Sequence, residues 1–118
     1  MRGRRHRPAR GARAGRRRWL LAPVLGLLAT LASSVVDQRT TARFEDIDGC
    51  IAGCEVAAAG WPLPYLVDYP GLSPGNDAAL IGLALGVDRL RPEAFVVDLL
   101  AWTALAAVLV LLLGRARR

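Results

Sequence analysis

Two long apolar segments divide the sequence into zones of different charge. Residues 19–36 include no charged side chain over 18 positions, and residues 94–114 include only Asp98 over 21 positions. A helix that crosses a bilayer needs about 20 mainly apolar residues, so both segments predict membrane-spanning helices. The first lies at the short end of that range, and the second gives the clearer signal. This pattern indicates a small integral membrane protein rather than a globular enzyme.

The segment between them, residues 37–93, predicts only short elements. Residues 40–47 and 55–60 are expected to be two strands around a Gly-containing connection, which together form a β-hairpin. Pro62 and Pro64 exclude a regular helix there. Residues 78–87 are apolar but too few to span a bilayer, so they suit an interfacial or loop-core helix. The predicted fold is mainly α: an antiparallel two-helix transmembrane hairpin with a small external loop that contains the β-hairpin.

Charge predicts the orientation of these segments. The chain has 118 residues and a net charge of +6; all 16 basic residues are Arg, with nine in residues 1–18 and three in residues 115–118. Residues 37–93 contain nine acidic residues and four arginines, a formal charge of −5. Arginines flank membrane helices on the cytoplasmic side, so both termini are expected in the cytoplasm and the loop outside. The predicted location is the bacterial inner membrane.

The predicted organisation has five parts. A disordered Arg-rich tail (1–18) precedes the first span (19–36), the external loop (37–93), the second span (94–114) and a short Arg tail (115–118). The first tail cannot bury enough apolar surface to become ordered. Its arginines are expected to bind anionic lipid headgroups. Nucleic acid is the other polyanion that such a tail attracts, but no aromatic side chain lies among the arginines to stack on bases, so we do not expect it.

The first apolar segment leaves two questions open. It is expected to stay as an anchor, but Thr30-Leu31-Ala32 also resembles a signal-peptide cleavage site, which would leave a single-span protein. Ala22, Gly26 and Thr30 form a stripe of small residues at four-residue spacing. Such a stripe can face another helix, although the high Ala and Gly content of the segment is the simpler explanation.

Cys50 and Cys54 are the only two cysteines and lie in the predicted external loop. An even number of cysteines in an oxidising compartment predicts a disulfide. A thiol–disulfide exchange site is the alternative, but such sites usually have C-x-x-C spacing. His6 is the only histidine and lies in the opposite zone, so no zinc site is predicted. No cofactor is expected.

Asp98 lies about one turn inside the second apolar segment. Acids within membrane helices are candidates for functional roles. No second charge lies in either apolar segment to form a relay, so we expect Asp98 to reach the outer interface or to bind backbone groups of the loop.

Residues 40–105 resemble a loose group of bacterial two-span membrane proteins with no assigned activity. The resemblance is carried by three motifs: Gly60-Trp61-Pro62-Leu63-Pro64-Tyr65, then Asp68 with Pro70-Gly71-Leu72-Ser73, then Phe95-Val96-Val97-Asp98 with Trp102. It implies that Asp98 forms one structural unit with the segment from Trp61 to Tyr69. The candidate structural or interaction residues are therefore Trp61, Tyr65, Asp68, Tyr69, Asp98 and Trp102.

No serine–histidine–aspartate set, phosphate-binding glycine loop or paired acid–base site is visible in the sequence. We therefore expect a structural or accessory membrane protein without catalysis, with a membrane-protein partner or a second copy of the chain. The alternative is a tethered redox protein that uses Cys50 and Cys54. The external loop is expected to cap the outer helix ends, with Trp61, Tyr65 and Tyr69 at the interface and the disulfide beside them.

Overall fold

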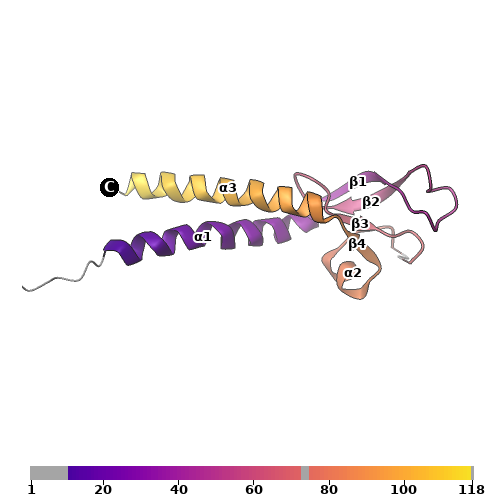
Figure 1. Ribbon diagram of the computed structural model, residues 1–118, viewed down its shortest axis with the longest axis horizontal. Coiled ribbons are helices and arrows are strands. Elements are labelled where there is room, and N and C mark those ends of the chain that lie inside the picture. The colour runs from indigo at the N-terminus through magenta and orange to yellow at the C-terminus, as the bar shows by residue number, and fades with distance from the viewer. Residues whose placement is uncertain (1–10, 73–74, 118) are drawn as a thin grey trace, which may run out of the picture.

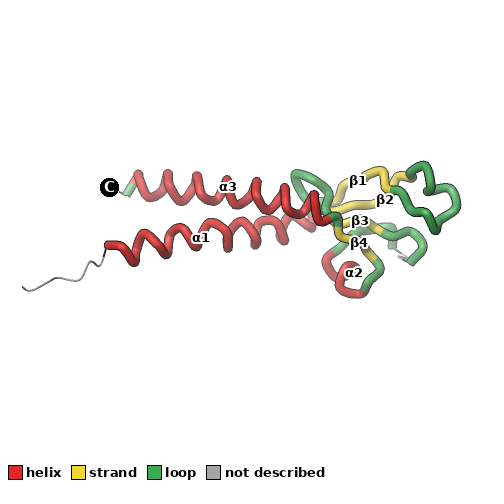
Figure 2. The backbone as a smooth tube through the Cα atoms, in the orientation of Figure 1, coloured by secondary structure: helices red, strands yellow, loops and turns green. Residues whose placement is uncertain are grey.

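The computed structural model describes residues 11–72 and 75–117, which form an elongated molecule (Figures 1 and 2). Two long helices, α1 (Gly11–Ala32) and α3 (Pro92–Ala116), lie side by side in opposite directions. A small sheet with a short helix lies beyond the end of α1 and the start of α3. The start of α1 and the end of α3 therefore lie at the same end of the molecule, far from the sheet.

Both long helices follow from the apolar segments, with changes at their ends. Each is long and apolar enough to cross a membrane, over Gly15–Val35 and Pro92–Ala116. α1 begins at Gly11, so residues 11–18 are helical rather than disordered as predicted; the rest of that prediction, residues 1–10, lies outside the described residues. Pro23 consequently lies inside α1 and not in its first turn. Pro92 occupies the start of α3, where its missing N–H costs little.

Four strands form one antiparallel sheet in the order β1-β2-β3-β4. A short 3₁₀ turn (Ser33–Val35) leads from α1 into β1 (Asp37–Ala42), which pairs along its whole length with β2 (Cys54–Ala59). β3 (Leu66–Asp68) pairs with β2 and with β4 (Asp88–Leu90). The helix α2 (Leu80–Leu85) lies between β3 and β4 in the chain.

The predicted fold class is therefore wrong. The helices are not joined by a small loop with a two-stranded hairpin: a four-stranded sheet and a third helix connect them. The hairpin of β1 and β2 exists, but its strands begin and end earlier than predicted. β3 and β4 have three residues each, too few to display the alternation that identifies a strand in sequence. They form because long-range pairing, of β3 with β2 and of β4 with β3, satisfies their backbone groups.

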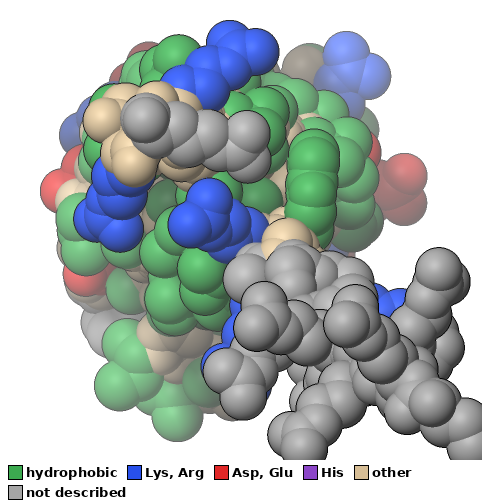
Figure 3. Space-filling model, turned by 90° about the vertical axis from the view of Figure 1, so that its left-hand side faces the viewer, with side chains coloured by type: hydrophobic (Ala, Val, Ile, Leu, Met, Phe, Trp, Pro, Cys, Tyr) green, Lys and Arg blue, Asp and Glu red, His purple; other side chains and the backbone are tan. Residues whose placement is uncertain are grey.

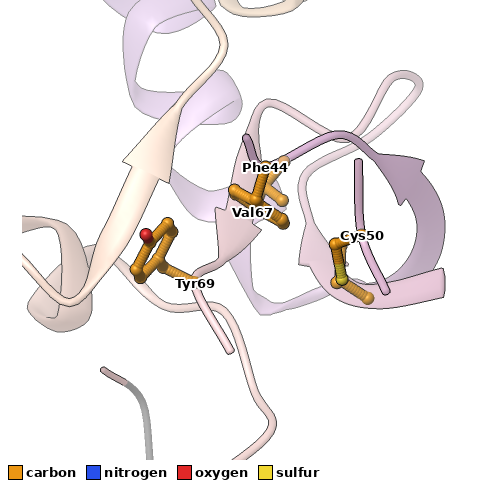
Figure 4. Packing of buried hydrophobic residues seen from close by; sticks show 5 residues of the cluster. Phe44, Cys50, Val67 and Tyr69 are labelled. Carbon is orange, nitrogen blue, oxygen red and sulfur yellow. The ribbon is translucent and has the colours of Figure 1, made fainter. Parts of the chain in front are cut away.

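Two apolar clusters hold the sheet. The cluster near the helices contains Ala59, Tyr65, Leu66, Ala78 and Ala94, and so joins the sheet to α3. The cluster far from the helices, which we call the distal cluster, contains Phe44, Cys50, Val56, Val67 and Tyr69 (Figure 4).

Candidate functional site: the junction between the helices and the sheet

Buried polar groups connect α1 to the sheet at its last turn. The Tyr65 hydroxyl, on a fully buried side chain, donates a hydrogen bond to the Thr30 carbonyl oxygen at 2.6 Å. The Ser33 hydroxyl donates to the same oxygen at 2.7 Å and accepts from the Trp61 N–H at 3.2 Å. Burial raises the pKa of Tyr65, so its hydroxyl remains a donor. The Thr30 carbonyl, one of the last four of α1, therefore accepts a hydrogen bond from the sheet domain.

Asp98 makes the corresponding connection from α3. Its side chain is fully buried, and its Oδ1 accepts a hydrogen bond from the Leu63 N–H at 3.0 Å. One turn further along, the Trp102 indole N–H donates to the Trp61 carbonyl oxygen at 2.9 Å, and the two indole rings pack 5.6 Å apart. The contact expected from the sequence, between Asp98 and a loop backbone N–H, is thus present. Residues 61–63 are attached to α3 at two successive turns.

Two glycines are required where backbones approach closely. Gly60 has φ +119°, and a Cβ there would lie 2.4 Å from the Tyr65 ring. Gly26 faces α3, where a Cβ would lie 2.2 Å from Thr103 Oγ1. Ala22 and Thr30 are also buried. The stripe of small residues therefore faces the other long helix. The sequence alone did not decide whether it would.

The Cys50–Cys54 disulfide is present, but not at the junction. It lies in the connection between β1 and β2, at the end of the sheet away from the helices, and Cys50 is buried in the distal cluster (Figures 1 and 4). The prediction that it lies beside Trp61 and Tyr65 is wrong, because the hairpin extends away from the helix ends.

Tyr69 belongs to the same distal cluster and not to the helix interface. Its ring packs edge-on against Phe44 at 5.0 Å, and the Arg89 guanidinium lies 4.4 Å from its centre. Its hydroxyl donates to Asp46 Oδ2, which raises the pKa of Tyr69 and lowers that of Asp46. Because strand residues alternate, Val67 and Arg89 lie on one face of the sheet, and Leu66, Asp68 and Asp88 lie on the other.

Asp68 and Asp88 form a buried carboxyl pair. They are opposite each other on β3 and β4, and their side chains are 1% and 5% exposed. Asp88 Oδ2 accepts the Ala79 N–H at 2.8 Å, just before α2 begins. The Oδ1 atoms of both residues have no hydrogen-bond partner in the described part of the chain. Burial raises the pKa of Asp88, and the neighbouring Asp68 and Asp77 carboxylates add to this effect.

The structure thus separates the predicted site residues into groups. Trp61, Tyr65, Asp98 and Trp102 meet at the junction, Asp68 lies with Asp88 under α2, and Tyr69 is in the distal cluster. Sequence reasoning missed Thr30 and Ser33 as members of the junction. Their only signal was two hydroxyl side chains three positions apart near the end of an apolar segment.

Among residues 11–72 and 75–117, no group of three histidine, cysteine or acidic side chains is placed to hold a metal ion. No protein-family model matches the sequence, no curated protein matches it, and no solved structure matches the fold. The protein thus has two long apolar helices joined to a sheet domain through buried polar contacts. Its function must be inferred from this arrangement.

Proposed function

We propose that this is a bacterial inner-membrane protein in which α1 and α3 cross the bilayer and the sheet lies outside the cytoplasm. The observation that carries the proposal is the exposure of large apolar side chains around both helices. Leu20, Leu28, Leu100 and Leu113 are 58–64% exposed, and no other part of the described chain covers them. A patch of this size in water would favour aggregation, whereas acyl chains cover it without cost.

The ends of the helices support a specific orientation. Arg16, Arg17 and Arg18 precede the apolar part of α1, and Arg115 and Arg117 end α3, so the positive side is the side of both termini. Trp19 is 66% exposed at that side, and the Trp61–Trp102 pair lies at the other. Tryptophans at both ends match the two interfaces of a bilayer.

Reporter fusions test the orientation. A reporter that is active only outside the cytoplasm should be inactive when fused after Arg118 and active when inserted at the exposed turn between Asp48 and Gly49. A cytoplasm-specific reporter should give the opposite pattern. Activity of the first reporter after Arg118 would contradict the two-span arrangement. A mature protein that begins at Ser33 would show that α1 is a cleaved signal peptide.

We propose further that the protein is structural or accessory and has no catalytic activity of its own. Three polar side chains at the junction join the long helices to residues 61–65: Ser33, Tyr65 and Asp98 each make a hydrogen bond between the two parts. Such contacts hold an external sheet in a fixed position on two membrane helices. This arrangement suits display of the sheet to a membrane-protein partner or to a second copy of the chain.

The alternative is a tethered redox protein that uses Cys50 and Cys54. Against it, Cys50 is only 7% exposed and packs with Phe44, Val67 and Tyr69, and Cys54 is half-buried against the same cluster, so an incoming thiolate has restricted access. Incubation of membranes with a glutathione buffer, followed by alkylation and mass measurement, distinguishes a structural disulfide from a redox-active one. A bond that stays oxidised supports the structural role, and rapid exchange would favour the redox role.

A further inference from the structure

A groove lies between the long helices, near the start of α1 and the end of α3. It has a volume of about 300 Å³, at the lower end of the range for ligand sites. Its walls are mainly apolar and include Trp19, Ala22, Val110 and Leu111, and two arginines, Arg18 and Arg115, also line it. We call it the helix-end groove.

The groove exists because small residues bring the helices together at one level and leave space at another. α1 and α3 touch where Gly26 meets Thr103, and they diverge towards the termini (Figure 1). Ala22 and Gly114 leave this wider part unfilled. Gly114 lies next to the Arg18 guanidinium, since a Cβ there would be in van der Waals contact with Arg18 Nη1 at 3.4 Å.

Among the described residues, no acidic one lies near the arginines at this end of the two long helices. All ten acidic residues lie between Asp37 and Asp98, and Asp98 lies at the opposite end of α3. In the part of the chain that the structure describes, the ion pairs are Arg39–Glu55 and Arg91–Glu93, both in the sheet domain or at its border. Figure 3 looks onto this end and shows arginine side chains around hydrophobic ones.

We propose that the helix-end groove binds one anionic phospholipid of the cytoplasmic leaflet. Arg18 and Arg115 bind the phosphate through charge-assisted hydrogen bonds, which the planar guanidinium group favours. One acyl chain lies in the groove against Trp19 and Leu111. The apolar walls select a phospholipid over a free phosphate ion, because an ion would leave them uncovered. The inference rests on the proposed membrane location and adds a defined lipid site to it.

Native mass spectrometry of the full-length protein in detergent micelles tests the site, with phosphatidylglycerol and phosphatidylcholine as probes. The wild type should retain one phosphatidylglycerol in preference to phosphatidylcholine. Arg18→Gln with Arg115→Gln should weaken this binding by roughly tenfold or more, since each change removes a charge-assisted hydrogen bond to the phosphate. Arg16→Gln with Arg17→Gln is the matched control. It also removes two positive charges, but from residues that do not line the groove, and should change binding less than twofold.

Two further measurements test the acyl-chain part. Gly114→Leu keeps both arginines but fills the groove, so it should also lose the bound lipid; retained binding would overturn the chain site. Inorganic phosphate added at millimolar concentration should not displace the lipid, and displacement would show a free-anion site instead. Equal loss in the two double variants would show only diffuse attraction and overturn the proposal.

The reporter fusions separate this proposal from the membrane location. If they give the predicted orientation but the wild type shows no lipid preference, the lipid site alone is wrong. If the wild type does not enter membranes, the proposed location itself fails. Helical circular dichroism of each variant, compared with the wild type, shows whether lost binding reflects lost folding.

Discussion

The backbone N–H of Leu63 donates a hydrogen bond to the Asp98 carboxylate, so a segment 35 residues earlier in the chain is fixed to α3. Asp98→Leu would remove the acceptor of this partly buried hydrogen bond, which costs about 1 kcal/mol. Asp98→Asn keeps an oxygen in the same place and should cost less. We expect limited proteolysis of membranes to cut residues 37–93 faster in Asp98→Leu than in Asp98→Asn.

Val97→Leu is the matched control for Asp98, because Val97 is on the same turn of α3 and is 48% exposed. It should leave the cleavage rate at the wild-type value. If Asp98→Leu is cleaved no faster than Val97→Leu, the carboxylate does not hold the sheet against the helices. Its role would then be at the interface with a partner.

The contact between Gly26 and Thr103 predicts a strong effect of any side chain at position 26. A Cβ there would lie 2.2 Å from Thr103 Oγ1 and 2.7 Å from its Cα, so the helices would have to separate. Overpacking of this kind costs about 1–3 kcal/mol. Gly26→Leu should therefore lower the midpoint of thermal unfolding in micelles, followed by circular dichroism. Leu25→Ile, on the exposed side of the same turn, should leave the midpoint unchanged. Equal midpoints for Gly26→Leu and Leu25→Ile would show that α1 and α3 do not pack through Gly26.

The sequence predicted the long helices because their signal is local and repeats over about 20 residues. It also predicted the disulfide and the hairpin of the first two strands. The sheet as a whole was missed, since Leu66–Asp68 and Asp88–Leu90 are too short to show a pattern and are separated by α2. Their strand conformation depends on pairing of β3 with β2 and of β4 with β3, which no local rule reveals.

The junction was predicted in part. Asp98 stood out because a charged side chain is unusual in an apolar helix, and the resemblance implied that it forms one unit with the segment from Trp61 to Tyr69. Trp102 was named only by the resemblance, and its contact with Trp61 was not predicted. Tyr69 was assigned to the helix interface because tyrosines often lie at headgroup level. It lies instead under Arg89 in the distal cluster, because β3 directs the chain away from the helix ends after Asp68.

Removal of the Cys50–Cys54 disulfide should destabilise the distal cluster without releasing the junction. Closure of a loop of five residues contributes about 2 kcal/mol in chain-entropy estimates. Replacement of both cysteines by Ala should therefore speed hydrogen exchange in β1 and β2, while the Leu63 amide keeps its protection. Ile51→Ala, a 62% exposed position in the same turn, is the control and should change neither. Faster exchange at Leu63 would mean that the sheet unfolds as one unit with the junction.

The Asp68–Asp88 pair predicts that acid stabilises the sheet. Burial raises the pKa of Asp88, the Ala79 N–H opposes this shift, and the charges of Asp68 and Asp77 add to it. The folded state therefore holds the Asp88 proton more tightly than the unfolded state. The stability it contributes is complete below the unfolded pKa of about 3.9 and declines as pH rises towards the raised folded value. Each unit of difference between the two pKa values corresponds to about 1.4 kcal/mol.

Thermal unfolding at a series of pH values, from about 4 to about 8, measures this decline. Asp88→Asn keeps an acceptor for the Ala79 N–H but cannot ionise, so it should gain stability over the wild type as pH rises. Asp68→Asn removes the facing charge and should give a smaller gain of the same sign. Asp48→Asn removes an exposed carboxyl and should follow the wild type. If wild type and Asp88→Asn lose stability in parallel over this range, Asp88 ionises equally in both states, and the buried pair does not make the sheet sensitive to pH.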